Sequence, residues 1–512
     1  MNDNIFYSDI IISKSGIEIP LFNTGKTVDS RYDPVKESLR LSQEIDEKTN
    51  FVIVLGIASG ILIKTILEKR ANIFILALEA EQKDIDFLLR LQTVKELSLN
   101  KRICFCTTKE LFQKITQLYI PAFYNNLKVI EQRGWTAEHN SLLPQINQEI
   151  QKAVGIVSAD FSVQSHFGKL WQHNIITNIS VIEKTKELNY QSLPIKSKKA
   201  LVLAAGPTID KTINQIKNNL NEYFIIATDT AFSILLSYNI IPQLVISLDG
   251  QNISTSHFIH TQQFDFSNTI FLFDLCANAS AVKKIINEKH HVSFFVSGHP
   301  LSDYIKQRFK LKIPKLYSGA GTVTIAALDF AIKCGFTKII VAGADFGYSN
   351  GKPYAKGTYL DRLYNKSSQR LNSNQKQFST LMYRTPLIKK NQNSSTSQIL
   401  QAYQTSFEDY LVEQDLTFVK EDQVYKISNQ KSQISFYNKE ALSQNLNGNK
   451  IIQELYKDIL SVDSNREINT IFDLTKTDIC LLPLISWQKN NDNIDKTDFM
   501  YFYRKVLGGI KK

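Results

Sequence analysis

Glycine, serine and aspartate recur in this sequence directly after short β-branched or aromatic runs, or directly before a predicted helix. Glycine lets a ligand approach the backbone, and aspartate accepts hydrogen bonds from ribose or sugar hydroxyls. In an open parallel sheet such positions lie together at the carboxyl ends of the strands, where ligands bind. We therefore predict a nucleotide-sugar site formed by Gly206, Pro207, Thr208, Asp229, Asp249, Asp274, Ser297, His299, Ser318, Gly319 and Asp345.

Two segments of this set have the pattern of anion-binding loops. Gly206-Pro-Thr208 follows a predicted strand and begins a helix, whose first-turn amides can bind an anion. It has neither the Walker ending nor the dinucleotide spacing, and a tight strand-to-helix turn explains it equally well. Ser318–Thr322 precedes another long helix, so the two loops could hold a ribose and a phosphate. We expect a side chain at Gly319 to impair ligand binding more than folding.

The acidic residues and one histidine of this set are candidates for proton transfer. Asp229 and Asp249 each end a strand, where a carboxylate binds hydroxyls or moves a proton. Helix capping at Thr230 is an alternative role for Asp229, and a turn is an alternative for Asp249. Asp345 follows a strand so apolar that we expect it at the centre of the sheet. We expect His299 to titrate near neutral pH, and Asp249 or His299 to be the general base.

Apolar runs that alternate with amphipathic stretches predict an α/β fold with mostly parallel sheets. We divide the chain into a Rossmann-like N-terminal domain (1–140), a helical connector (141–195), a central nucleotide-sugar-binding domain (196–364) and a mostly helical C-terminal domain (365–512). The central strands are expected at 200–204, 223–227, 244–248, 270–273, 292–296 and 338–342. One hairpin is expected in the C-terminal domain, near 418–434.

The N-terminal domain contains the pattern of a cofactor turn. Gly56 to Gly60 follows a predicted strand and precedes a helix, and Glu79 ends the next strand about twenty residues later. This resembles the cofactor turn and ribose-binding acid of a methyltransferase-type Rossmann domain. The middle glycine of that turn is missing, so a purely structural Rossmann domain is an equal alternative.

Length and composition limit the classes of protein. At 512 residues the chain is too long for one hydrophobic core. The net charge is +11, but the basic residues are scattered, so we expect a generally basic surface and no nucleic-acid partner. Five cysteines without a CxxC pair indicate a reducing compartment. No leader pattern and no membrane-spanning run is present, which predicts a cytoplasmic protein. Metal-site spacing is absent, so we expect no required cofactor and an optional divalent metal.

Several motifs, in their order along the chain, resemble the motility-associated (Maf) flagellin glycosyltransferase family. They are Ser30–Pro34, Val54–Gly56, Gly206–Thr208, Asn239–Pro242, Ser247–Asp249 and Ser318–Phe346. That family lies within the domain-of-unknown-function 115 proteins, which include 6-hydroxymethylpterin diphosphokinase MptE-like enzymes. The last motif is also similar to bacterial sialyltransferases that use a CMP-activated nonulosonic acid.

The resemblance implies a Rossmann-like domain, a sialyltransferase-like central domain and a helical C-terminal domain that contacts the protein substrate. It also implies transfer of pseudaminic or legionaminic acid from a CMP-sugar to Ser or Thr of flagellin or another protein acceptor. Gly206, Pro207 and Thr208 would then line the phosphate loop, and Asp229 and Asp249 would face ribose or sugar. Ser318 and Gly319 would contact the cytosine or phosphate side.

Two departures from the sialyltransferase pattern leave the base open. Those enzymes have asparagine where this chain has Asp229 and Asp249, and their base is a histidine after the last motif, whereas 354–371 contains none. Two alternative functions therefore remain. One is a pterin diphosphokinase-like phosphotransferase, which would require Mg²⁺, and the other is a non-enzymatic escort of flagellin or a surface protein.

Overall fold

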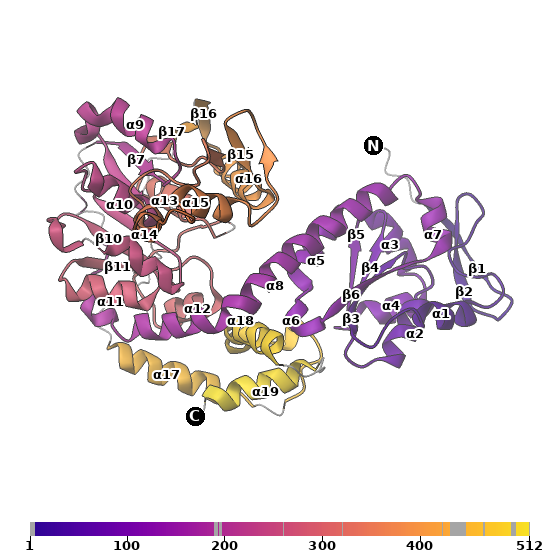
Figure 1. Ribbon diagram of the computed structural model, residues 1–512. Coiled ribbons are helices and arrows are strands. Elements are labelled where there is room, and N and C mark those ends of the chain that lie inside the picture. Colours follow the sequence, from indigo (N-terminus) through magenta and orange to yellow (C-terminus); the bar gives the residue numbers. More distant parts are fainter. Residues whose placement is uncertain are drawn as a thin grey trace. The chain divides into compact units, whose positions relative to one another are not determined.

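The computed structural model describes residues 6–188, 193, 197–259, 261–319, 321–421, 423–430, 447–463, 466–492 and 498–510. The chain forms two compact units (Figure 1). Unit 1 consists of Met1–Lys169 and Asp458–Lys512, and unit 2 consists of Leu170–Lys457. Both units contain parallel sheets with helices, so the predicted α/β class is confirmed.

Unit 1 is built on a four-stranded parallel sheet with the strand order β5-β4-β3-β6. The two central strands, β3 (Thr49–Leu55) and β4 (Phe74–Glu79), are almost wholly buried, as expected for apolar runs covered on both faces. The outer strands are β5 (Ile103–Thr107) and β6 (Asn126–Glu131), and an antiparallel hairpin precedes them, β1 (Tyr7–Ile12) and β2 (Glu18–Phe22). The helices are α1 (Pro34–Ser42), α2 (Ile61–Lys69), α3 (Gln82–Leu88), α4 (Gln92–Ser98), α5 (Leu111–Leu118), α6 (Pro121–Tyr124) and α7 (Arg133–Glu138).

A long helix occupies the predicted helical connector. α8 (Leu143–Ile179) has 37 residues, and its amino-terminal part belongs to unit 1 and its last turns to unit 2. A short 3-10 helix, Ile182–Lys184, follows it. Residues 189–192 and 194–196, at the end of the predicted connector, lie outside the described residues.

Unit 2 is built on an eight-stranded sheet with the order β11-β10-β9-β8-β7-β12-β17-β16. Six strands are parallel and coincide with the six predicted ones to within a residue at each end: β7 (Lys199–Leu203), β8 (Phe224–Thr228), β9 (Leu244–Ser247), β10 (Ile270–Asp274), β11 (His291–Phe295) and β12 (Lys338–Ala342). Val202 pairs with Val341, so β12 lies beside β7 although four strands and their connections separate them in sequence. The chain therefore reverses its direction of winding between β7 and β12.

Two hydrophobic clusters cover the two faces of this sheet, because successive side chains of a strand point to opposite faces. Leu201 and Leu203 belong to the cluster with α9 (Ile209–Ile216) and α10 (Asp229–Ser237). Val202 belongs to the other cluster, with α13 (Val323–Lys333) and α16 (Gln398–Glu413). The remaining helices of the sheet are α11 (Ala279–Asn287) and α12 (Pro300–Arg308), and the 3-10 helices are Lys217–Glu222, Asn252–Phe258 and Thr261–Gln263.

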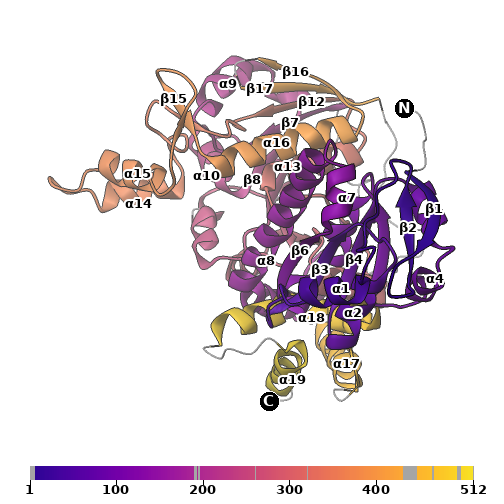
Figure 2. The ribbon, with the colours of Figure 1, turned by 90° about the vertical axis from the view of Figure 1, so that its right-hand side faces the viewer.

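A small helical hairpin projects from unit 2 (Figure 2). It consists of α14 (Tyr359–Lys366) and α15 (Asn374–Met382), whose facing rings Tyr364 and Phe378 have centroids 4.9 Å apart. A three-stranded sheet, β13 (Tyr348–Ser349), β15 (Ser394–Thr396) and β14 (Ile388–Lys389), closes its base.

The predicted C-terminal domain, residues 365–512, is wrong as a separate unit. Residues up to Lys457 belong to unit 2, where β17 (Val424–Ser428) pairs antiparallel with β12, and β16 (Thr417–Glu421) extends the sheet. The remaining residues pack on unit 1 through α18 (Lys476–Asn491) and α19 (Phe499–Ile510). Lys489 Nζ, for example, donates to the carbonyls of Pro121 (3.2 Å) and Ala122 (3.3 Å). These long-range contacts have no local signature.

Two further elements complete this stretch: α17 (Gly448–Leu460) and the 3-10 helix Ile471–Asp473. The hairpin predicted near 418–434 corresponds to β16 and β17, and its residues 431–434 lie outside the described residues. In the described part of the chain, helices are too short or too polar to cross a bilayer.

Candidate functional site

The predicted ligand residues of unit 2 follow the carboxyl ends of its parallel strands or precede the amino end of α13. Because β7 to β12 are parallel, the loops after them lie at one edge of the sheet. The reversal of strand order between β7 and β12 makes the loops after these two strands the expected walls of a crevice. The carboxyl edge of this sheet is therefore the candidate functional site.

At the reversal, the loop after β7 is bonded to the loop after β12. Asp345 accepts hydrogen bonds from the Thr208 amide (2.9 Å) and from the Thr208 hydroxyl. The Gly206 amide donates to the Gly343 carbonyl at 2.8 Å. A Cβ on Gly206 would lie 2.5 Å from that carbonyl oxygen, so only glycine allows this approach. Asp345 thus takes the place at the start of α9 that an anion was expected to occupy.

Burial raises the pKa of Asp345 above its usual value, while the two bonds from Thr208 lower it. A phosphate at the Gly206–Thr208 loop would have to share the Thr208 amide with this carboxylate. The sequence identified both residues as ligand contacts, but not their contact with each other.

The middle of the edge holds Asp229, the first residue of α10. Its carboxylate is buried and accepts hydrogen bonds from Ser247 Oγ (2.6 Å) and from the Thr230 amide (2.7 Å). The Thr228 side chain, rather than Asp229, caps the helix by accepting from the Ala231 amide. Asp229 therefore links the ends of β8 and β9 instead of serving as the N-cap.

Asp249 lies two residues after β9 and is half-buried. Its Oδ1 accepts from the Gln251 amide at 2.9 Å, which is the turn interaction that the sequence allowed as an alternative. The Asn278 amide donates to the Asp249 carbonyl at 3.0 Å and joins this loop to the loop after β10. The Asp249 side chain thus forms a turn hydrogen bond and remains partly exposed at the edge of the sheet.

Two tyrosines that the sequence analysis did not single out lie beside these aspartates. Burial raises the pKa of Tyr359 to about 12, and the nearby Tyr354 together with the charges of Asp249 and Asp229 adds to the rise. Burial also raises the pKa of Tyr354, with a smaller contribution from Asp229. Both hydroxyls are therefore protonated at neutral pH and can donate hydrogen bonds.

The segment that carries these tyrosines is fixed across the edge. The Ala355 amide donates to the Ala205 carbonyl after β7 (2.9 Å), and Ser233 Oγ on α10 donates to the Gly357 carbonyl (3.0 Å). The Tyr359 ring lies edge-on to the ring of His257, with centroids 4.8 Å apart. The sequence signal for this segment was weak, because a tyrosine near a strand end has no distinctive spacing.

Asp274, at the end of β10, is fully buried and serves the structure of its loop. Its Oδ1 accepts from the Cys276 amide at 2.6 Å. Burial raises the pKa of Asp274 to about 6, and the bonds from Cys276 and the Ser297 hydroxyl oppose the rise. Ser297 and Asp274 are therefore neighbours, since they belong to the ends of the adjacent parallel strands β11 and β10.

His299 does not behave as expected. Its Nδ1 accepts from the Leu301 amide at 3.2 Å and caps α12. Burial lowers the pKa of His299 to about 4, so the prediction that it titrates near neutral pH is wrong. Its ring lies edge-on to Trp171 of α8, with centroids 5.7 Å apart.

The last turns of α8 fix the loops after β9 and β10. Asn174 Nδ2 donates to the carbonyls of Gly250 and Cys276, each at 3.0 Å. Asn178 Nδ2 donates to those of Leu275 (3.0 Å) and Ala277 (2.9 Å). Two amide groups one helical turn apart thus position the loops that contain Asp249 and Asp274.

The Ser318–Thr322 loop precedes α13. The Ser318 carbonyl accepts from the amides of Gly321 (3.0 Å) and Thr322 (2.8 Å), and the Thr322 side chain caps the helix. Gly319 has φ of +55°, and a Cβ there would lie 2.6 Å from both Ile325 Cδ1 and Ser406 Oγ. The expectation that a side chain at Gly319 leaves the fold intact is therefore wrong. Ala320 lies outside the described residues.

The cofactor turn of unit 1 is filled by protein side chains. Glu79 accepts from the Ile57 amide (2.8 Å), Trp135 Nε1 (2.8 Å) and the Tyr7 hydroxyl (3.1 Å). A Cβ on Gly56 would lie 2.7 Å from the Trp135 ring. The acid that a cofactor ribose would need is thus bonded to the protein, which favours the structural alternative for this turn.

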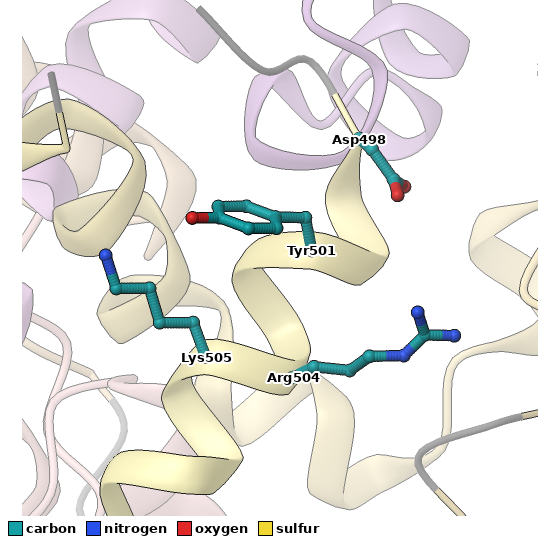
Figure 3. Close-up of a pocket in the computed structure, with 4 residues that line it drawn as sticks. All are labelled: Asp498, Tyr501, Arg504 and Lys505. Atoms are coloured by element: carbon teal, nitrogen blue, oxygen red, sulfur yellow. The ribbon is translucent and has the colours of Figure 1, made fainter. Parts of the chain in front are cut away.

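A hollow of about 670 Å³ is lined by Asp498, Tyr501, Arg504 and Lys505 (Figure 3). These four side chains project from α19 and the residue before it, and Lys505 pairs with Asp492 at 2.5 Å. None of the lining residues belongs to the sheet edge of unit 2. Among the described residues, no cluster of three or more His, Cys, Asp or Glu side chains could hold a metal ion.

Comparison with known proteins identifies relatives of both the sequence and the fold. A model of the family described as 6-hydroxymethylpterin diphosphokinase MptE-like matches residues 140–351. Two uncharacterized proteins of Treponema pallidum (strain Nichols) are each 34% identical, one over 200 residues (38% of this chain and 71% of the relative) and one over 152 residues (29% and 70%). The structure of the Maf glycosyltransferase from Magnetospirillum magneticum AMB-1 matches with a TM-score of 0.57 and 13% identity, over 98% of this chain and 90% of that chain. The chain therefore belongs to the MptE-like family and has the fold of a Maf glycosyltransferase.

Proposed function

We propose that this protein is a glycosyltransferase that moves a nonulosonic acid, such as pseudaminic or legionaminic acid, from a CMP-sugar to Ser or Thr hydroxyls of flagellin or another protein. The observation that carries the proposal is the group at the middle of the sheet edge in unit 2. Asp229, Asp249, Tyr354 and Tyr359 lie near enough for the aspartate charges to raise the pKa of Tyr359. The fold shared with a Maf glycosyltransferase supports the same reaction class.

The chemistry requires two things of the residues at this edge. The bond between the anomeric carbon of the sugar and a phosphate oxygen breaks, and CMP leaves with both bonding electrons. The acceptor hydroxyl oxygen forms the new bond to that carbon, and its proton passes to a base. Groups that donate to the phosphate therefore stabilise the departing charge, while a carboxylate takes the proton.

Each requirement has a candidate in unit 2. The protonated hydroxyls of Tyr354 and Tyr359 can donate to the departing phosphate. Asp249 is the candidate base, because its side chain is partly exposed and, among the described residues, accepts a hydrogen bond only at Oδ1, from the Gln251 amide. His299 is the weaker candidate, since its lowered pKa makes it a poor proton acceptor at neutral pH. We assign no required cofactor, and a divalent metal stays optional.

The family description favours a second candidate, a phosphotransferase acting on a pterin. That reaction transfers a diphosphate and would depend on Mg²⁺, whereas the proposed sugar transfer would not. Binding of CMP in the presence of EDTA separates the two. Calorimetry should show CMP binding that EDTA does not change; binding that appears only with Mg²⁺, or only with a pterin, would favour the phosphotransferase.

Asp249→Asn tests the site directly. The variant should fold normally and bind CMP but lose transfer of the sugar, because its amide cannot accept the proton. Asp265→Asn is a matched control: Asp265 makes the same kind of turn, accepting from the Ser267 amide at 2.9 Å, but precedes β10 at the opposite edge. Normal transfer by Asp249→Asn, or equal loss in both variants, would remove Asp249 from the reaction.

A further inference from the structure

The net positive charge of this chain is concentrated in one segment, although the basic residues themselves are scattered along the chain as expected. Residues 350–390, here called the basic protrusion, contain nine Lys or Arg residues and one acidic residue, Asp361. They carry a net charge of +8 out of +11 for the whole chain. The protrusion comprises the α14–α15 hairpin and the strand β14 at its base, and projects from the sheet of unit 2 (Figure 2).

Most of these basic side chains face solvent. Eight of the nine basic side chains are exposed: Lys352, Lys356, Lys366, Arg370, Lys376, Arg384, Lys389 and Lys390. In the described part of the chain, none of the nine forms an ion pair with a carboxylate, unlike Lys333 or Lys420 elsewhere in unit 2. The ninth, Arg362, is half-buried, and its Nη2 is buried without a hydrogen-bond partner among the described residues. The protrusion therefore presents a field that attracts anionic groups.

Apolar side chains are exposed among the basic ones. Leu371 is 86% exposed in the loop between α14 and α15, and Tyr383 is 71% exposed after α15. Leu363 and Ile388 are also exposed, while the hairpin's own core is formed by Phe378 and Met382. Apolar contacts surrounded by charged groups are typical of a protein interface.

The protrusion begins at the candidate site. Tyr359, the first residue of α14, lies against His257, and Gly357 is bonded to Ser233 of α10. A protein held along α14 would thus lie next to the group of Asp229, Asp249 and the two tyrosines. An anionic membrane would match the charge, but it would bring no hydroxyl side chain to this group.

We propose that the basic protrusion is the docking surface for an acidic face of the protein acceptor. The proposal rests on the proposed function for the identity of the partner, and its binding step can be measured separately. Attraction between the basic side chains and acidic residues would raise the association rate and hold the acceptor, while the exposed leucines, tyrosine and isoleucine would form the apolar contacts.

The test measures binding of the full chain to fluorescent poly-L-glutamate by anisotropy. One variant combines Lys366→Glu, Arg370→Glu, Lys376→Glu and Arg384→Glu, all at exposed positions of the protrusion. A control variant reverses the same number of exposed lysines elsewhere in unit 2: Lys217, Lys283, Lys310 and Lys338. Both should melt at the wild-type temperature.

We expect the protrusion variant to bind poly-L-glutamate about tenfold or more weakly, and the control variant to bind almost as the wild type does. Added salt should weaken wild-type binding toward that of the protrusion variant. Equal losses in the two variants would show that only overall charge matters, and would overturn the proposal. Binding to phosphatidylcholine–phosphatidylglycerol vesicles or to single-stranded DNA in preference to poly-L-glutamate would overturn it as well.

CMP binding separates this proposal from the proposed function. Both charge-reversal variants should bind CMP as the wild type does, because none of the eight changed residues is among those assigned to the carboxyl edge of the sheet. If the wild type did not bind CMP, the proposed glycosyltransferase function would be contradicted. A selective loss of poly-L-glutamate binding in the protrusion variant would still support the docking surface.

Discussion

Replacing Glu79 by glutamine tests the inference that the cofactor turn of unit 1 is structural. Glu79 is 0% exposed and accepts hydrogen bonds from the Ile57 amide, Trp135 Nε1 and the Tyr7 hydroxyl. Glutamine offers one oxygen to these donors and turns an N–H group toward the others. A buried donor is then left without an acceptor, which costs about 1–3 kcal/mol of unfolding free energy.

The wild type has a pH dependence that this variant lacks. Burial raises the pKa of Glu79 from 4.5 to about 7. Between these values the folded protein keeps a proton that the unfolded chain releases, so the free energy of unfolding falls as the pH rises. The difference between the two pKa values corresponds to about 3 kcal/mol of unfolding free energy. This stabilisation is present in full below pH 4.5 and is lost above about pH 7. Glutamine does not titrate, so the unfolding free energy of the variant does not fall with pH for this reason.

Hydrogen exchange of the β3 and β4 amides, corrected for intrinsic rates, gives the opening free energy of unit 1 in both proteins. At about pH 5 the variant should be less stable than the wild type by about 1–3 kcal/mol. At about pH 8 the difference should disappear or change sign. Glu81→Gln, at a half-buried neighbouring position paired with Lys109, is the control and should show no such crossing. A Glu79→Gln difference that is the same at both pH values would refute the reasoning.

Three further predictions concern unit 2. Gly319→Val should destabilise it by about 2–5 kcal/mol, because valine resists a positive φ and its Cβ would collide with Ile325; a wild-type melting temperature would contradict this. Tyr359→Phe should lower the turnover number for sugar transfer about 100-fold if its hydroxyl donates to the departing phosphate, whereas Tyr364→Phe on the same helix should not; equal rates would exclude that role. His299→Gln should keep the shape of the pH profile of transfer across neutral pH, since His299 is already neutral there, and loss of a limb near pH 6.5 would show that it titrates.

The strands of unit 2 could be predicted closely because each is a short buried run between helices. All six lie within a residue of their expected bounds, so the edge that gathers their following loops could also be foreseen. The contacts along that edge could not. Asp345 and Thr208 are 137 positions apart, and nothing local indicates that one would bond to the other.

Residues without a distinctive local pattern escaped the sequence analysis. Tyr354 and Tyr359 gain their significance from burial beside Asp229, which depends on how the segment crosses the sheet edge. The position of β16 and β17 at the end of the sheet depends on pairing with β12, and polar residues around them suggested a separate domain. The concentration of charge in the basic protrusion was present in the sequence, and a count over forty-residue windows finds it.

The composition of unit 1 from two distant parts of the chain has a consequence for biosynthesis. Its sheet is translated first, yet α18 and α19 emerge only after the whole of unit 2, about 340 residues later than Lys169. At bacterial elongation rates of about 5–20 residues per second, the apolar surface around α6 stays exposed for roughly 20–70 s before α18 and α19 have been translated. Unit 2, by contrast, is contiguous and can fold while it leaves the ribosome. A premature stop near residue 458 would therefore leave a complete unit 2 attached to a unit 1 that lacks α18 and α19.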